Sequence, residues 1–377
     1  MRVMNNLSDI FCQDRAINSL QRAYNAGRMA HAYLFVGTDG VGKFTTAQQW
    51  AKMLLCSDKQ VKTVGDTAFN DSCGKCENCR VFDGGSHPDF KEVYKELRQY
   101  TREGKGKTTP LDMPIDVIRE FVIEKVASKP SMADNVVFVI RQAERVNNAS
   151  QNALLKVLEE PPKHCVIILL CSQLEKMLPT TQSRCQVIRF GPIDEVRITE
   201  KLAEMGVSSA ESLYWARFSD GSLGQAIEWA SLELKESTCY QIKSDLVTRI
   251  AKQSLGDSIE IAEWMLSSAK KISDAWEKAA GETSKADIKR RALKGVIRMV
   301  IAVFQDVMRF GVEPNDRSIV NLDQRGQIQY LAERLTSEQA AGRVAKGYEN
   351  LRWIDASVNE KLILEELLLN YAGSGIL

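Results

Sequence analysis

The pattern of apolar and polar positions divides the chain into a first part in which strands and helices alternate and a second part that is helical. Two stretches have helical spacing, residues 44–56 and residues 147–162, and the second ends at Pro161 and Pro162. Three near-continuous apolar runs are typical of strands buried in a parallel sheet: AYLFVG (32–37), NVVFVI (135–140) and CVIILLC (165–171). This alternation predicts an α/β domain with a parallel sheet over residues 1–190.

After GPIDE (191–195) the strand signal disappears and only helical patterns remain. Residues 293–310 and 359–372 are apolar over more than one helical face, which is typical of helices buried in a bundle or against a partner. We therefore predict a helical domain over residues 191–245 and an all-α domain over residues 246–377. This division agrees with the about two or three domains expected for a chain of 377 residues.

The composition, 44% hydrophobic and 26% charged, is that of a globular protein. The formal net charge of +1 gives no overall preference for nucleic acid, so any contact with DNA must be local. The first residues lack the apolar core of a signal peptide, and the longest apolar stretch, VIILLC (166–171), is far below the roughly 18 residues that span a bilayer. We expect a cytoplasmic protein with no membrane association.

A glycine-rich loop, GTDGVGKFTT (37–46), follows the first predicted strand and precedes a predicted helix. This is the setting of a phosphate-binding P-loop, in which glycines let backbone N–H groups turn toward phosphates at a helix N-terminus. Gly37, Gly40 and Gly42 are the candidate glycines, and Lys43 is placed to neutralise the β- and γ-phosphate oxygens. The loop therefore permits the binding of ATP or ADP.

The same region lacks the residues that hydrolysis requires. The position after the lysine, where a hydroxyl would bind Mg²⁺, is Phe44, and Thr45 lies about 100° further round the helix. The second predicted strand runs into Arg141 and Gln142 where an ATPase carries acidic residues, and an arginine would repel the ion. Glu144 lies beyond the strand end and is interpreted as a helix-start acid. We therefore expect no hydrolysis at this loop.

Four of the nine cysteines form the strongest metal-binding pattern in the chain. CGKCENC places Cys73, Cys76 and Cys79 at C-x-x-C-x-x-C spacing, and Cys56 at the end of the preceding helix completes four thiolates for Zn²⁺. Four protein ligands leave no position for water, so the zinc would be structural and would hold together a polar module at about residues 56–79. The alternative is that the four cysteines are buried and unrelated. Three cysteines within seven mostly polar residues argue against it, because such a segment is not typical of a packed core.

Taken together, these motifs resemble the bacterial DNA polymerase III clamp-loader ATPase family. The resemblance rests on HAYLFVGTDGVGK, on CGKCENC with HPDF after it, on NALLKVLEEPP and on TTQSRC, and it covers about residues 8–230. The C-terminal third is similar only in being helical. The resemblance implies an AAA+-type α/β domain with an inserted zinc module, a helical lid and a helical collar. The collar would join subunits into a hetero-oligomer, expected to be a pentamer.

Within this family the resemblance favours the delta-prime branch, whose ATP site is often degenerate, over the gamma/tau motor branch. The family lid carries a γ-phosphate-sensing arginine in a motif like G-S-x-R-x-A, and this chain has Gly224 at that position. In the family, the arginine of the S-R-C triplet reaches the ATP of a neighbouring subunit. This implies that Arg184, together with Ser183, acts in trans as an arginine finger. Ser172 matches a polar sensor position of the family. From residue type alone, a surface arginine in a salt bridge is the alternative for Arg184.

The resemblance implies a scaffold subunit of a polymerase holoenzyme, with no ATPase activity of its own. Its implied partners are the gamma/tau and delta subunits, the sliding clamp and primed DNA. Two alternatives stay open from the residues. One is an ATP-hydrolysing, gamma/tau-like motor subunit that uses its loop unconventionally, and the other is a nucleotide-binding module without catalysis.

Overall fold

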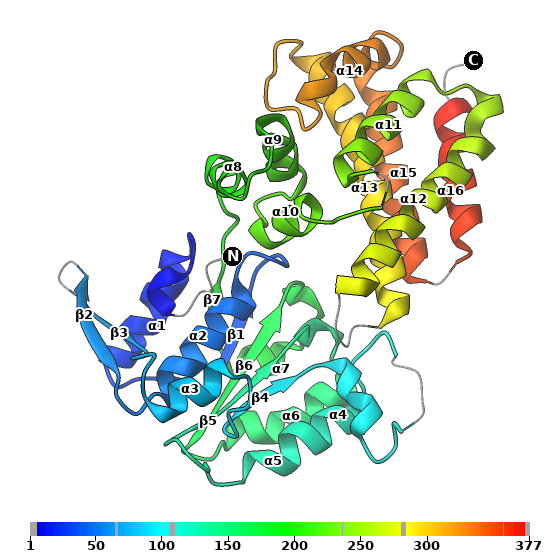
Figure 1. Ribbon diagram of the computed structural model, residues 1–377. Helices are drawn as coiled ribbons and strands as arrows, with labels where there is room; N and C mark the ends of the chain where they lie inside the picture. Colours follow the sequence, from blue (N-terminus) through cyan, green and yellow to red (C-terminus); the bar gives the residue numbers. More distant parts are fainter. Residues whose placement is uncertain are drawn as a thin grey trace. The chain divides into compact units, whose positions relative to one another are not determined.

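A computed structural model describes residues 6–64, 67–105, 110–235, 237–279, 284–356 and 358–373. The chain forms two compact units, Met1–Ile193 and Asp194–Leu377. The first unit contains a parallel sheet, and the second is built from helices (Figure 1). The lid and collar, predicted as separate domains on either side of residue 245, lie in the same compact unit, and their separation stays a prediction.

The first unit is built on a five-stranded sheet in the order β4-β5-β6-β1-β7, in which all neighbouring strands are parallel. The three strands predicted from apolar runs are confirmed as β1 (Ala32–Val36), β5 (Val136–Ile140) and β6 (Cys165–Cys171). They are the three central strands of the sheet. Both faces of a central strand are covered, which is why its sequence is apolar at nearly every position.

The sequence pattern missed the edge strands β4 (Phe90–Val93) and β7 (Gln186–Arg189), and the hairpin of β2 (Gln60–Val64) and β3 (Thr67–Asp71). Each edge strand has four residues, of which two are charged or polar, so neither produces an apolar run. The hairpin is a separate two-stranded antiparallel sheet. The insertion that carries the cysteines therefore has its own secondary structure.

Helices cover both faces of the five-stranded sheet (Figure 1). Those of the first unit are α1 (Asp14–Asn25), α2 (Lys43–Leu55), α3 (Glu77–Asp83), α4 (Ile115–Ile118), α5 (Glu124–Val126), α6 (Asn148–Glu159) and α7 (Pro179–Gln182). The two helices predicted from spacing are confirmed as α2 and α6. Helix α6 begins where the Asn147 side chain accepts a hydrogen bond from the Ser150 N–H at 2.9 Å.

Alternate side chains of the central strands pack into two hydrophobic cores, one on each face of the sheet. Leu34 and Phe138 belong to the core that includes residues of α4 and α6. Tyr33 and Val137, their neighbours in sequence, belong to the core that includes residues of α1 and α2, among them the fully buried Trp50. The sheet thus lies between two layers of helices. These layers cover its faces but not the ends of its strands, where the loops that can bind ligands begin.

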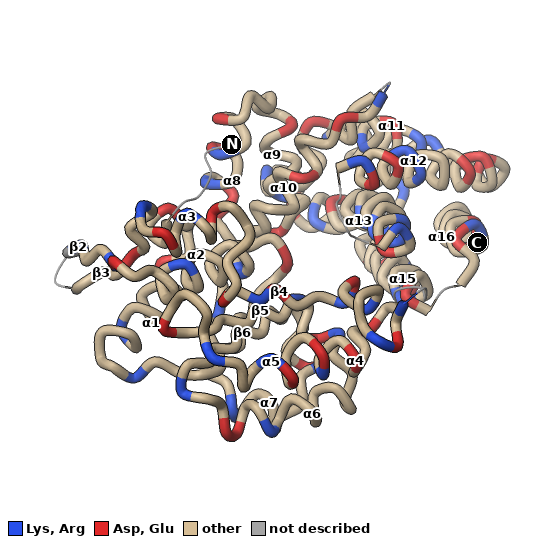
Figure 2. Tube along the Cα trace, turned by 60° about the horizontal axis from the view of Figure 1, so that its bottom comes forward, with Lys and Arg blue, Asp and Glu red and all other residues tan. Residues whose placement is uncertain are grey.

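The described residues of the second unit form helices and one isolated β-bridge. Its α-helices are α8 (Glu195–Glu204), α9 (Ser209–Phe218), α10 (Leu223–Ala230), α11 (Cys239–Lys252), α12 (Ser258–Ala279), α13 (Lys285–Val312), α14 (Arg325–Ala332), α15 (Ser337–Asp355) and α16 (Glu360–Gly373). Among the described residues, no helix is long and apolar enough to cross a membrane. Basic and acidic residues are interspersed along the described parts of both units (Figure 2).

Three tryptophans join the helices of the second unit. The ring of Trp229 in α10 stacks on Trp215 of α9 at a centroid distance of 5.6 Å and meets Trp276 of α12 edge-on at 4.8 Å. Gly295 of α13 makes room for the same ring, because a Cβ there would lie 2.4 Å from it. Helices from the predicted lid and from the predicted collar therefore share one aromatic core.

Arg298 of α13 makes polar contacts with two of these helices. Its guanidinium donates to the Phe218 carbonyl oxygen at 3.2 Å and to the Gln225 side-chain oxygen at 3.1 Å. It also lies over the Phe218 ring, 5.1 Å from the ring centre. Burial lowers the pKa of Arg298, and these contacts replace the water that the guanidinium loses.

Candidate functional site

The glycine loop lies where a P-loop is expected, between the end of β1 and the start of α2 (Figure 1). Gly40 and Gly42 have φ angles of +82° and +106°, in the left-handed region that favours glycine. A Cβ atom on Gly37 would lie 2.6 Å from the Phe190 carbonyl oxygen, so this position also requires glycine. The backbone of the loop thus needs all three glycines, with or without a phosphate.

Lys43 is the first residue of α2, and the loop itself holds its side chain. The Nζ atom donates hydrogen bonds to the carbonyl oxygens of Gly37 and Thr38, the second at 2.8 Å. It also lies 3.4 Å from a carboxylate oxygen of Asp39. Only 6% of Lys43 is exposed. A phosphate would have to compete with these oxygens for the ammonium group.

The two positions that would bind Mg²⁺ in an ATPase are in contact with each other here. The guanidinium carbon of Arg141 lies 5.0 Å from the centre of the Phe44 ring, a cation–π arrangement. Arg141 also donates to a carboxylate oxygen of Glu92 at 2.9 Å. An aromatic ring and a cation therefore occupy the places where a hydroxyl and a carboxylate are required, and neither offers an oxygen to the metal.

Glu144 and Ser172 connect the ends of two central strands. Gln142, the second residue after β5, has a φ angle of +50° and turns the chain toward Glu144. The Glu144 carboxylate then accepts hydrogen bonds from the Ser172 N–H at 3.2 Å and from its hydroxyl at 2.6 Å. Glu144 does lie in the first turn of a short 3-10 helix, Ala143–Arg145, as the helix-start interpretation predicted, but its carboxylate is bound to a residue beyond β6. Ser172, which matched a sensor position, is held by this carboxylate.

The four cysteines predicted as zinc ligands come together at the C-terminal end of α2. Cys56 caps that helix, Cys73 follows β3 closely, Cys76 caps α3, and Cys79 lies within α3. Their Sγ atoms all lie within 4.8 Å of one another, with 3.6 Å between Cys56 and Cys73 and 3.9 Å between Cys73 and Cys79. Sulfurs that bind zinc tetrahedrally are about 3.8 Å apart, because each Zn–S bond is about 2.3 Å. The cluster therefore fits a four-thiolate zinc ion.

Backbone N–H groups point at the sulfur atoms of this cluster. The N–H of Cys73 donates to the Cys56 sulfur at 3.4 Å, and the N–H of Cys76 donates to the Cys73 sulfur at 3.2 Å. Burial alone would raise the pKa of Cys76, but hydrogen bonds with Ser57 and Cys79 lower it to about 6. Burial raises the pKa of Cys56 and of Cys79, so the close spacing of the sulfurs and the N–H groups that approach them, rather than a shared low pKa, suit the cluster to Zn²⁺. A set of four thiolate ligands is structural rather than catalytic.

Arg184 lies two residues after α7, and one-third of its side chain is exposed. Its guanidinium donates to the Thr180 carbonyl oxygen at 2.9 Å and forms an ion pair with Glu159. Ser183 is exposed, and its hydroxyl donates to the same carbonyl oxygen at 3.1 Å. Within the described parts of the chain, these hydrogen bonds and this ion pair do not involve the glycine loop. These contacts hold Arg184 against α6 and α7 and not against its own glycine loop.

A buried glutamine in α6, which sequence reasoning missed, holds the segment that leads to Arg184. The Nε2 atom of Gln151 donates to the carbonyl oxygens of Val146 and Lys176, at 2.9 and 3.3 Å. Its Oε1 atom accepts from the Leu178 N–H at 2.9 Å and from the Thr181 hydroxyl at 3.4 Å. A polar residue on the inward face of an amphipathic helix was the sequence signal that could have found it.

The nucleotide loop and the cysteine cluster lie at opposite ends of α2. The helix has 13 residues, so the two ends are about 20 Å apart at 1.5 Å per residue. The structure thus brings together the four cysteines, and it brings Phe44 to Arg141, but it does not combine the cysteines and the loop in one site.

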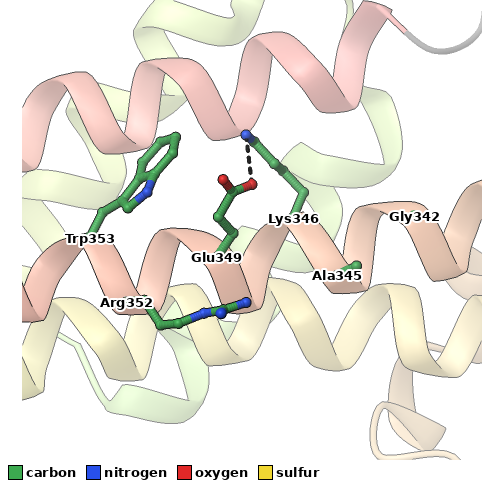
Figure 3. A pocket seen from close by; sticks show the side chains of 6 residues that line it. All are labelled: Gly342, Ala345, Lys346, Glu349, Arg352 and Trp353. Atoms are coloured by element: carbon green, nitrogen blue, oxygen red, sulfur yellow. Dashed lines mark hydrogen bonds and ion pairs between the residues drawn. The ribbon is translucent and has the colours of Figure 1, made fainter.

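A separate pocket of about 570 Å³ lies along α15 in the second unit (Figure 3). Lys346 pairs there with Glu349 at 3.0 Å and with Glu366 of α16 at 2.6 Å. Its lining residues are Gly342, Ala345, Lys346, Glu349, Arg352 and Trp353. None of the predicted site residues is among them, and the lysine is already paired with carboxylates.

Comparison with known proteins gives relatives along the whole length of the chain. It is 24% identical to the DNA polymerase III subunit delta-prime of Bacillus subtilis over 95% of both chains. It is 30% identical to the delta-prime subunit of Escherichia coli over 65% of both chains. The DNA polymerase III subunit tau/gamma of Haemophilus influenzae is 32% identical over 52% of this chain but only 25% of its own length.

The parallel sheet with a glycine loop after β1, together with the helical second unit, defines a protein with a P-loop-like α/β domain followed by a helical region. A family model described as DNA polymerase III, delta subunit, matches residues 12–194, and one described as its C-terminal part matches residues 284–372. The chain belongs to the delta-prime family of bacterial DNA polymerase III clamp-loader subunits.

Proposed function

We propose that this chain is a non-hydrolysing clamp-loader subunit that lends Arg184 to the ATP site of a neighbouring motor subunit. Its partners in this proposal are the gamma/tau and delta subunits of a hetero-oligomeric, pentameric assembly. Through that assembly it acts on the sliding clamp and on primed DNA. Similarity to a delta-prime subunit over 95% of both chains supports this assignment over that of a gamma/tau motor.

The observation that carries the non-hydrolysing role is the contact between Arg141 and Phe44. To bind Mg²⁺ at the end of β5, the protein would have to move the guanidinium away from both the ring and Glu92. The displaced cation would still lie beside a divalent ion and repel it. Without the metal, the transferred phosphoryl group lacks the divalent ion that bridges the phosphates, and the ammonium of Lys43 is already bound by oxygens of the loop.

The residue at the position of the family's lid arginine also supports the non-hydrolysing role. Gly224 is the second residue of α10 and lies exposed, directly after the Ser222 cap and Leu223. A glycine has no side chain that could reach a γ-phosphate. The chain therefore lacks the hydroxyl, the acidic pair and the lid arginine of a hydrolysing site.

Two observations support the proposed role of Arg184. Its side chain is partly exposed, and its hydrogen bond and ion pair are made with Thr180 and Glu159 rather than with its own glycine loop. A guanidinium stays protonated and carries five N–H donors, which suits it to the charge on a γ-phosphate. An arginine finger of this kind accelerates other nucleotide hydrolases by about 10³–10⁵. The cysteine cluster has a structural task in this proposal, with Cys56, Cys73, Cys76 and Cys79 as the zinc ligands.

The non-hydrolysing role is tested with the isolated chain. We expect no Mg²⁺-dependent ATP turnover above background, and no change on Lys43→Ala, which removes the ammonium group predicted to bind the β- and γ-phosphates. ATP turnover by the wild-type chain that disappears in Lys43→Ala would overturn the proposal and favour a motor subunit.

The role of Arg184 is tested in the reconstituted clamp loader. Arg184→Ala should leave the assembly intact, as judged by gel filtration, and remove most of the DNA-stimulated ATP hydrolysis at the site that this arginine completes. Arg189→Ala, which removes an exposed arginine nearby, is the matched control and should hydrolyse ATP normally. Equal rates for wild type and Arg184→Ala would contradict the proposed finger.

A further inference from the structure

We infer that Glu159 is the positioning residue for Arg184: its carboxylate holds the guanidinium at the surface, oriented so that it can meet a phosphate of an adjoining subunit. The inference rests on the proposed role of Arg184 in trans. It adds the residue of this chain that prepares the finger before the neighbouring subunit arrives.

The ion pair connects two segments whose ends are well defined. Glu159 is the last residue of α6, and Pro161 and Pro162 prevent the helix from continuing. Arg184 follows α7, and its Nη2 atom pairs with the Glu159 carboxylate, while its Nη1 atom donates to the Thr180 carbonyl oxygen. Each end nitrogen of the guanidinium thus has its own acceptor, and the plane of the group is determined by both.

These two partners leave the guanidinium able to bind a further anion. The hydrogen bond to Thr180 uses one of its five N–H donors, and the ion pair with Glu159 lies at Nη2, so further donors are not used in these contacts. Phosphate oxygens are strong acceptors for the remaining donors, and a planar fork binds them in a fixed geometry. The guanidinium of Arg184 is therefore held in one orientation and still has N–H donors for a phosphate.

The base from which the finger projects is itself rigid. Gln151 ties α6 to the segment before α7 through its contacts with Lys176, Leu178 and Thr181. Glu159 and Arg184 therefore sit on elements that a buried side chain keeps in register. A loop arginine without such support would have to order itself at each encounter, which weakens binding.

The competing effect, that a carboxylate diminishes the positive charge of the finger, is the smaller one here. Glu159 is 46% exposed and Arg184 33% exposed, so water and salt screen the field of the carboxylate. Screening weakens the field at a distance more than it weakens the close ion-pair contact at Nη2, and that contact is what orients the guanidinium together with the hydrogen bond to Thr180. Loss of the Glu159 charge should therefore slow the proposed trans reaction rather than speed it.

The first test observes Arg184 directly in the isolated chain. In ¹⁵N-arginine NMR spectra, the Arg184 signal is identified by its loss in Arg184→Ala. Rotation of its guanidinium should be slower in wild type than in Glu159→Gln by about two- to fivefold, the range for an exposed ion pair. Glu160→Gln removes the adjacent exposed carboxylate and should behave as wild type. Equal rotation in wild type and Glu159→Gln, or an equal effect of Glu160→Gln, would overturn the inference.

The second test measures ATP hydrolysis by the reconstituted clamp loader. The share of the rate that depends on Arg184, which is the difference between wild type and Arg184→Ala, should fall about two- to fivefold in Glu159→Gln. The KM for ATP should not change, because the finger acts in the transition state. Glu160→Gln should keep the full rate, and Glu159→Gln should have no further effect in the Arg184→Ala background.

The outcomes separate the two proposals. If Glu159→Gln slows hydrolysis equally with and without Arg184, the residue has a general structural role and the inference fails while the finger stands. If Arg184→Ala does not alter hydrolysis, the finger itself fails, and the NMR spectra still decide whether Glu159 holds Arg184.

Discussion

Phe44 and Arg141 come from different elements, one from the first turn of α2 and the other from the residue after β5, and the fold brings ring and guanidinium to 5.0 Å. Each was recognisable in the sequence as a departure from an ATPase motif. Their contact was not, because the side-chain geometry at the end of a parallel sheet depends on strand order and helix placement. The two departures are physically one feature, since the ring stabilises the cation that replaces the acid.

A paired substitution tests this feature at the residue scale. Phe44→Thr with Arg141→Asp restores a hydroxyl and a carboxylate as oxygen ligands, so Mg²⁺ should strengthen ATP binding by about tenfold, against little change in wild type. Isothermal titration of ATP with and without Mg²⁺ measures this difference.

The control for that pair is Phe44→Val with Arg141→Leu, which removes the same contact but offers the metal no oxygen. Its affinity for ATP should not depend on Mg²⁺. If the two pairs respond alike to Mg²⁺, the metal is not bound at these positions and the interpretation of the pocket is incorrect.

At the scale of elements, sequence patterns predicted the strands that are buried on both faces of the sheet and missed the strands at its edges. β1, β5 and β6 were found because central strands must be apolar. β4 and β7 were missed because FKEV and QVIR contain charges that an edge strand tolerates. The cysteine cluster was found by spacing alone. The roles of Glu159 and Gln151 were not found from the sequence, because they depend on how α6 packs against α7 and the residues on either side of it.

The cysteine-containing insertion is the element whose stability should depend most on metal. We expect one zinc per chain by elemental analysis, and Cys76→Ser should lower that content, because three thiolates bind Zn²⁺ more weakly than four. Zinc should also be lost as the pH falls, since protons compete for the thiolates.

Cys12→Ser is the matched control for this experiment, because Cys12 lies outside the cluster. It should keep the full zinc content. Native protein without zinc, or equal zinc in wild type and Cys76→Ser, would refute the site.

At the scale of the whole molecule, the chain forms two compact units, and the second joins the predicted lid and collar in one core. Trp229 packs against helices of both parts, and Arg298 bridges α13 to α9 and α10. Helical spacing predicted the helices of this unit, but not that they form one body. Contacts between helices depend on which faces meet, and no single helix pattern contains that information.

Arg298→Met tests the cohesion of the helical unit. The substitution removes the hydrogen bonds that the guanidinium donates to the Phe218 carbonyl oxygen and to the Gln225 amide oxygen, so the free energy of unfolding should fall by about 2–3 kcal/mol. Urea denaturation followed by tryptophan fluorescence reports on this unit, because Trp215, Trp229 and Trp276 lie in its core.

Lys289→Met removes an exposed cation from the same helix and should change the unfolding free energy by less than about 0.5 kcal/mol. A loss in Lys289→Met as large as that in Arg298→Met would mean that the contacts of Arg298 with α9 and α10 are not what stabilises the unit.

The pairing of Phe44 with Arg141 also has a consequence for descent. A single reversion of Arg141 to an acid would place two carboxylates together, because Glu92 would lose its cation. A single reversion of Phe44 would leave the guanidinium without its ring. Each single substitution thus removes one partner of a contact and leaves the other behind, and both Mg²⁺ ligands are present only when the two positions change together. On the proposed non-hydrolysing role, this mutual dependence makes the loss of Mg²⁺ binding hard to reverse one substitution at a time.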